Sequence, residues 1–129
     1  MFTVKQIEDA HSKVKSGVDF PNYIQEIRQL GVVEFETWVN NSHTVYFGSE
    51  NFKTSSLPQY EALQISNEVK TNSFIQKLKS HQKGETDYYT FCKDCADTGI
   101  EKWIVNLNQM TCIYYDKYNN KVLVEKIPH

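Results

Sequence analysis

The amino-acid sequence predicts an α+β fold: a tandem duplication of a helix-helix-β-meander unit, with antiparallel sheet and helices packed on one face. Three observations predict it. The two halves of the chain resemble each other, apolar residues recur at helical spacing where each half begins, and apolar and polar residues then alternate as in a strand. We therefore expect a single domain over residues 1–129, with repeats at about 4–55 and 71–127 and a linker at about 56–70.

A shift of 68 residues aligns the second half of the chain with the first. Between positions 19 and 53 the identical pairs are Asp19/Asp87, Gly31/Gly99, Asn40/Asn108, Tyr46/Tyr114, Asn51/Asn119 and Lys53/Lys121. Other pairs match in chemical class, such as Phe35 with Trp103 and Val45 with Ile113. Because the hydrophobic pattern and the turn residues repeat together, we interpret the similarity as an internal duplication.

Each half is predicted to begin with two helices. The second helix starts at Asp19 or Asp87, whose carboxylate we expect to cap it, and ends at Gly31 or Gly99, a residue type that tolerates the left-handed conformation. The helix stripes, read from the period of 3.6 residues, are Val4, Ile7, His11, Val14, Phe20, Tyr23, Ile24, Ile27 and Leu30 in the first half, and Phe74, Leu78, His81, Tyr88, Phe91, Cys92, Cys95 and Thr98 in the second.

Three strands follow the helices in each half, because the apolar period changes to two. The predicted strands cover residues 33–39, 43–47 and 52–55 in the first half and 103–107, 111–115 and 121–127 in the second, and residues 62–66 are predicted to form one further short strand. The short connections between strands favour antiparallel pairing. The sequence leaves open whether the two halves share one continuous sheet.

The amino-acid composition and the net charge of the chain argue against some classes of function. The net charge of -2 and the pI of about 6.1 offer no electrostatic attraction to nucleic acid or to anionic lipid, so we expect neither as a partner. No stretch approaches the ~20 apolar residues that span a bilayer, and the N-terminus has no signal-sequence pattern, which predicts a cytoplasmic protein. Three cysteines, an odd number, fit a reducing compartment better than a disulfide framework.

Four segments of the chain resemble those of a known family. They are residues 43–48 (HTVYFG), 91–96 (FCKDCA), 99–103 (GIEKW) and 123–128 (LVEKIP). On these residues the chain resembles the YbcV-like family of uncharacterised small bacterial proteins, whose members are often labelled phage envelope protein. The resemblance extends over nearly the whole chain and supports the predicted fold. It implies no activity, because no catalytic or binding residue is established for that family.

Cys92 and Cys95 are the residues with the most reactive side chains. Two cysteines separated by two residues can carry out thiol-disulfide exchange or, with Cys112 and a histidine, bind zinc. A redox pair needs a helix N-terminus, whereas Cys92 lies more than a turn inside the predicted helix, and the pair aligns with Ile24 and Ile27 of the first half. We therefore expect both cysteines to be buried in the core.

Aromatic residues form the other candidate site. We place Val45 and Phe47 on the core side of the sheet, which sends Tyr46 and Tyr114 to the opposite face, where Trp38 joins them. An exposed aromatic patch of this kind marks a ligand or partner face. The alternative is that other helices, or the linker around residues 57–63, cover it.

Two hypotheses of function follow. The leading one is a non-enzymatic soluble binding module, in which Trp38, Tyr46 and Tyr114, or a cleft between the repeats, bind an unknown small molecule or a partner protein, a second copy in a homodimer included. The alternative is a thiol-based redox enzyme or sensor, or a metal-binding protein, that uses Cys92 and Cys95 with Cys112. We assign no catalytic residue, metal or cofactor, because no nucleophile, base and stabilising group can be assembled from the sequence.

Overall fold

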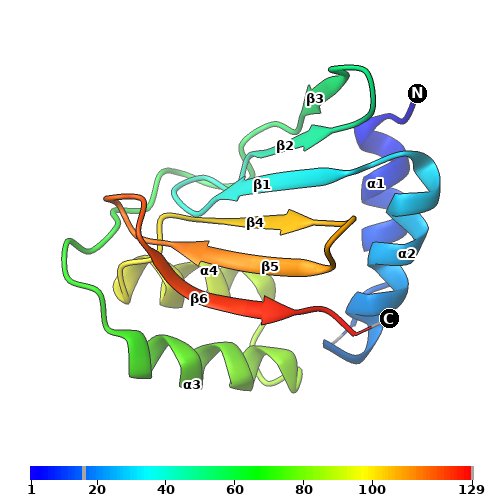
Figure 1. Ribbon diagram of the computed structural model, residues 1–129. Coiled ribbons are helices and arrows are strands. Elements are labelled where there is room, and N and C mark those ends of the chain that lie inside the picture. The colour runs from blue at the N-terminus through cyan, green and yellow to red at the C-terminus, as the bar shows by residue number, and fades with distance from the viewer. Residues whose placement is uncertain (16, 129) are drawn as a thin grey trace.

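The computed structural model describes residues 1–15 and 17–128, and this part of the chain has the predicted α+β fold (Figure 1). It contains four α-helices, one short 3-10 helix and six strands. Their bounds are α1 (Val4–His11), η1 (Gly17–Asp19), α2 (Phe20–Leu30), β1 (Glu34–Trp38), β2 (Thr44–Phe47), β3 (Lys53–Ser55), α3 (Thr71–Gln82), α4 (Tyr88–Asp97), β4 (Lys102–Asn106), β5 (Thr111–Tyr115) and β6 (Lys121–Lys126). The six strands agree with the predicted ranges to within one residue at each end.

The prediction of a further short strand at residues 62–66 was wrong, because these residues form no strand. The Leu63 N–H donates to the Asn40 carbonyl at 2.6 Å, and the Ser66 N–H donates to the Ala96 carbonyl at 2.8 Å. These two acceptors belong to a turn and to a helix end, so no single strand offers the segment a ladder of hydrogen bonds. The segment is therefore held by hydrogen bonds at separate points.

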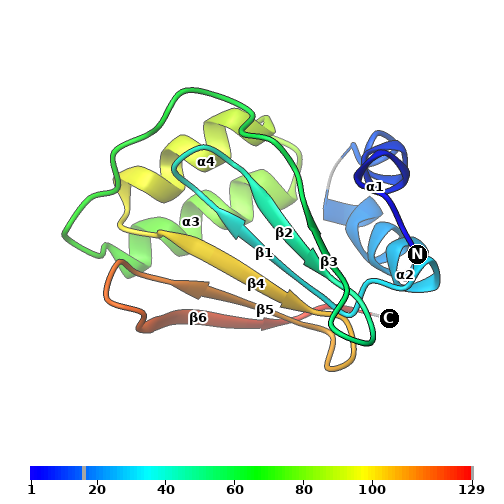
Figure 2. The same ribbon diagram turned by 90° about the horizontal axis from the view of Figure 1, so that it is seen from above.

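The two halves share one sheet, which answers the question that the sequence left open. The strand order is β3-β2-β1-β4-β5-β6, and every neighbouring pair is antiparallel. Each half contributes a three-stranded meander, and β1 pairs with β4 where the meanders meet. The four helices lie on one side of this sheet, as Figure 2 shows.

The helix ends follow the predicted chemistry with one exception. Asp87 caps α4, since its carboxylate accepts a hydrogen bond from the Thr90 N–H at 2.8 Å. Hydrogen bonding by the Thr90 hydroxyl, and then by this N–H, lowers the pKa of Asp87. Asp19 makes no such bond with α2. It ends η1 in a helical conformation, so its carboxylate accepts instead from the Lys15 N–H at 2.9 Å.

Left-handed residues recur at equivalent places in the two halves. Gly31 (φ 111°) ends α2 and Gly99 (φ 88°) follows α4, as predicted. The pairs Ser42 and Met110, and Asn51 and Asn119, also have positive φ. Each of these pairs is 68 positions apart, so the same turn conformations follow the same elements in both halves.

The core lies between the helices and one face of the sheet. Directly opposed residues of neighbouring strands share a face, so Phe35 lies with Tyr46 and Val105, and Trp103 lies with Tyr114. Helix residues buried against this face include Ile7, Ile24, Ile27, Phe74, Leu78, Phe91, Cys92 and Cys95. Both helix pairs and both meanders therefore contribute to one contiguous cluster.

We predict that Gly99→Ala destabilises the fold more than Gly31→Ala. Both changes put an L side chain at a positive φ, at a cost of about 1–2 kcal/mol. A Cβ at Gly99 would also lie 2.7 Å from the Glu68 carbonyl oxygen, whereas a Cβ at Gly31 would meet only Phe2 Cδ2 at 3.6 Å. Overpacking should add about 1–3 kcal/mol at Gly99.

Urea unfolding of the two variants and the wild type measures this difference in the free energy of unfolding. Equal losses at Gly31 and Gly99 would contradict the close approach of the linker to the end of α4.

Candidate functional site

The sheet has a second face that none of the helices in the described part of the chain covers (Figure 2). We call it the open face. Its side chains belong to the strand positions that alternate with the core positions. They are Glu34, Glu36 and Trp38 of β1, Val45 and Phe47 of β2, Ile104 and Lys102 of β4, Ile113 and Tyr115 of β5 and Val124 of β6. All but Val124 are half-buried, which shows that they pack on one another across the strands.

The structure separates the three aromatic residues that we expected on one exposed face. Trp38 lies on the open face, but Tyr46 and Tyr114 are only 8% and 6% exposed and belong to the core. The Tyr46 ring packs on Phe35 with centroids 5.7 Å apart, and the Tyr114 ring packs on Phe74 at 4.9 Å. The expectation of a shared exposed face was therefore wrong for both tyrosines.

The length of the turn between β1 and β2 explains this error. Thr37 pairs with Thr44 and Phe35 with Tyr46, so the odd positions of β1 share a face with the even positions of β2. Apolar character alone suggested the core side for Val45 and Phe47, yet the register turns them to the open face. The hydroxyls of Thr37 and Thr44, 2.8 Å apart, satisfy each other inside the core.

A charged and aromatic group occupies one end of the open face, where β1 and β5 end and β4 begins. Lys102 and Trp38 are directly opposed across β4 and β1, and the Lys102 Nζ lies 4.8 Å from the centre of the Trp38 ring and 5.4 Å from that of Tyr115. The same Nζ lies 3.3 Å from Glu36 Oε1. The His43 ring stacks on the Trp38 ring with centroids 6.1 Å apart. We call these five residues the Trp38 cluster.

The Trp38 cluster is held more firmly than an ordinary surface group. The side chains of Lys102 and Glu36 are 17% and 20% exposed, so solvent screens their ion pair only in part. A cation over aromatic faces contributes about 0.5–2 kcal/mol, more where water is excluded. The cluster therefore presents a fixed surface of indole and phenol rings, flanked by apolar side chains.

All three cysteines are buried, as expected for Cys92 and Cys95. Both are 0% exposed, and Cys112 is 6% exposed on the core face of β5. Burial raises the pKa of each thiol, that of Cys112 to about 12. The hydroxyls of Tyr60 and Tyr88 oppose this rise at Cys92, which lies in the middle of α4. The thiols are therefore protonated at neutral pH.

The described residues offer little to a metal ion. Within residues 1–15 and 17–128, no three His, Cys, Asp or Glu side chains gather in a group that could hold one. His81 packs its ring on Phe91 at 4.4 Å, and His11 packs on Tyr23 at 5.1 Å. Both histidine rings are therefore engaged in packing, and burial lowers the pKa of each.

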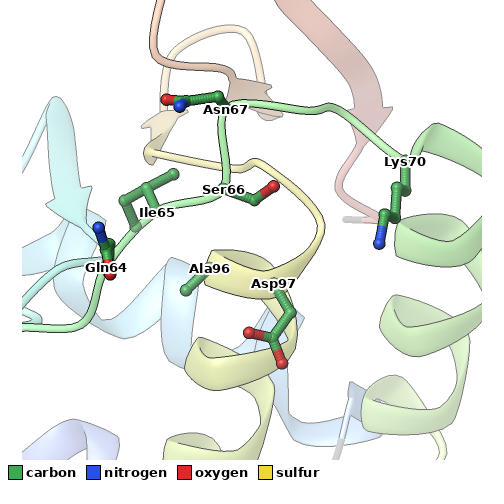
Figure 3. A pocket seen from close by; sticks show the side chains of 7 residues that line it. All are labelled: Gln64, Ile65, Ser66, Asn67, Lys70, Ala96 and Asp97. Atoms are coloured by element: carbon green, nitrogen blue, oxygen red, sulfur yellow. The ribbon is translucent and has the colours of Figure 1, made fainter.

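Two hollows in the described part of the surface are open to solvent, and the larger one is mainly polar. The larger, of about 540 Å³, lies between the linker and the end of α4, and Figure 3 shows its polar side chains spread around a wide opening. The smaller, of about 190 Å³, lies between α1 and α2. The larger is lined by Gln64, Ile65, Ser66, Asn67, Lys70, Ala96 and Asp97. Neither has the apolar, enclosing walls that small-molecule sites usually have.

Comparison with protein-family models shows which family the chain belongs to. Residues 8–126 match the family model described as Protein of unknown function (DUF1398). The chain belongs to the DUF1398 family. No curated protein matches it. Membership in DUF1398 therefore supplies a family of uncharacterised proteins and no activity.

The structure of this DUF1398 chain adds one further observation about its helices. In the part of the chain that the structure describes, no helix combines the length and the apolar character needed to cross a bilayer.

We predict that Cys92, Cys95 and Cys112 react with iodoacetamide only after the protein unfolds. Burial excludes the reagent, and the raised pKa values leave almost no thiolate at neutral pH. Pulse alkylation at pH 7.5, read by mass spectrometry with and without urea, measures the reaction. Ser49→Cys, at an exposed position, is the positive control. Fast labelling of any native cysteine would show that this part of the core opens to solvent.

Proposed function

We propose that this protein is a non-enzymatic binding module and that the open face binds a partner protein. One observation carries the proposal: the Trp38 cluster lies on a sheet face that none of the described helices covers. Tryptophan and tyrosine are enriched among residues that dominate binding energy, especially where neighbours exclude water. Val45 and Ile104, both directly opposite Glu36, and Ile113, opposite Ile104, provide such neighbours.

A protein fits the open face better than a small molecule does. A small ligand needs a concave site that surrounds most of its surface, whereas the larger hollow is open and polar and the smaller holds only about 190 Å³. A sheet face offers a broad, gently twisted surface instead, which suits contact with another protein surface.

The thiol alternative requires an accessible thiolate at Cys92, Cys95 or Cys112. Burial and raised pKa values oppose that requirement at all three positions. No arrangement of the described residues favours redox chemistry, so we do not propose it as the function.

We also propose that the chain arose by tandem duplication. The proposal is supported by the six identical pairs at a spacing of 68, the same order of helices and strands in both halves, and the paired left-handed residues.

The free cysteines support a cytoplasmic location. YbcV-like membership, with its phage envelope label, stays a proposal supported by the four segments given above.

Site-specific photo-crosslinking tests the proposed function. A benzoylphenylalanine at position 104, on the open face, should give a discrete crosslinked product in the cells that encode the protein. The same residue at position 79, exposed on α3, is the matched control and should give none. With the partner identified by mass and purified, Trp38→Ala should weaken binding about thirtyfold, the ~2 kcal/mol typical of an interface hot spot.

Lys79→Ala should leave that affinity unchanged, and circular dichroism of both variants checks that they fold. The proposal fails if position 104 gives no product, or if positions 104 and 79 give the same products.

A further inference from the structure

Three rows of side chains run across the strands on the open face. Directly opposed residues of neighbouring strands form each row, so the pairing registers decide which side chains lie next to one another. The middle row runs from β2 to β6 and consists of Val45, Glu36, Ile104, Ile113 and Val124. Four of these five side chains are apolar, and Val124 at the end of the row is 52% exposed.

The one charged side chain of the middle row is paired within the open face. Glu36 Oε1 lies 3.3 Å from the Nζ of Lys102, which belongs to the next row, beside Trp38. The middle row is therefore an apolar strip whose single carboxylate already has a partner.

Lysines flank this apolar strip on both sides. The pairing of β6 with β5 places Lys121 in the row on one side of the strip and Lys126 in the row on the other side. Lys53 lies at the β3 end of the row that contains Lys126. We call Lys53, Lys121 and Lys126 the flanking lysines.

The flanking lysines are available to the charges of a partner. All three are exposed, and among the described residues none of them forms an ion pair. Glu34, in the row of Lys53 and Lys126, is the one unpaired carboxylate among the described strand positions of the open face. The open face therefore carries an excess of positive charge, although the whole chain has a net charge of -2.

We propose that the partner protein docks an amphipathic helix along the middle row and that Asp and Glu residues border the apolar stripe of this helix. The inference rests on the proposed function and specifies the chemistry of the partner. A partner strand would pair with an edge of the sheet, whereas an amphipathic helix lays its apolar side chains on an apolar surface. Opposite charges at the border of such a contact speed association and reject partners of the wrong charge.

The dimensions of the rows fit a helix. Neighbouring strands are ~4.8 Å apart, so the row from β2 to β6 is ~19 Å long. A helix of ~13 residues has this length. The flanking rows lie two residues away along each strand, ~7 Å to either side. A helix with its side chains has a radius of ~5–6 Å, so carboxylates beside its apolar stripe can reach the flanking lysines.

The flanking lysines also have a simpler explanation. Lysine on an edge strand discourages pairing between sheets, and other charged residues serve the same purpose. Recognition of an acidic helix, by contrast, requires the positive sign of the charge. Reversal of the charge therefore separates the two explanations.

Charge reversal in the photo-crosslinking assay tests the proposed chemistry. The probe is the full chain with benzoylphenylalanine at position 104, which lies in the middle row. The variant Lys53→Glu/Lys121→Glu/Lys126→Glu should lower the yield of crosslinked product at least tenfold, because like charges then face each other. As the matched control, Lys77→Glu/Lys79→Glu/Lys83→Glu changes the net charge equally at exposed positions in and just after α3, and it should leave the yield unchanged.

Two further measurements accompany the reversal. Thermal unfolding shows whether each variant is folded, and Lys53→Gln/Lys121→Gln/Lys126→Gln, which removes the charges without reversing them, should give an intermediate yield. Mass spectrometry of the crosslinked peptides should place the contact in a partner segment with apolar residues at helical spacing bordered by Asp and Glu.

The possible failures of this inference and of the proposed function are distinct. The inference is overturned if both open-face variants crosslink as well as the wild type, if the α3 variant loses as much product, or if the contacted segment lacks the helical spacing or the carboxylates. Each of these results leaves the proposed function standing. A wild-type chain that gives no product from position 104 overturns both.

Discussion

The antiparallel pairing of β1 with β4 is the contact on which the rest of the structure depends. It is the one strand pair that links the two meanders, and its register sets Phe35 opposite Val105 and Thr37 opposite Trp103. Because side chains alternate along a strand, this register alone directs the core residues of both meanders to the same side. The helices of both halves can then cover one face together and bury a single cluster.

The same pairing builds the surface on the other face. Trp38 and Lys102 are register partners across β1 and β4, and Glu36 lies two residues before Trp38 on β1. The cation over the indole ring and the ion pair both bridge the two halves of the chain. The contact that joins the halves therefore also holds the side chains that we propose as the binding surface. The core and the candidate site therefore lie on opposite faces of the same strand pair, β1 and β4.

The hydrophobic periodicity and the residues that cap or end helices predicted where the helices and strands lie, because local chemistry decides where each element begins and ends. Gly31, Gly99 and Asp87 end or begin helices through their own backbone or carboxylate. The faces of β2 and β5 could not be predicted in this way, because they depend on turn length and register, which are not local. Tyr46 and Tyr114 were misplaced for that reason, and their pairing with Phe35 and Trp103 corrects it. The Trp38 cluster joins residues far apart in sequence, and only the sheet brings Lys102 to Trp38.

The fluorescence of the two tryptophans tests the central register most directly. Trp103 is 8% exposed in the core, whereas Trp38 is half-buried on the open face, and the chain has no other tryptophan. In Trp38→Phe, the remaining Trp103 should emit at short wavelength and resist quenching by acrylamide. In Trp103→Phe, the remaining Trp38 should emit at longer wavelength and be quenched readily. The reverse order, or two equally shielded tryptophans, would contradict the β1–β4 register and the open face.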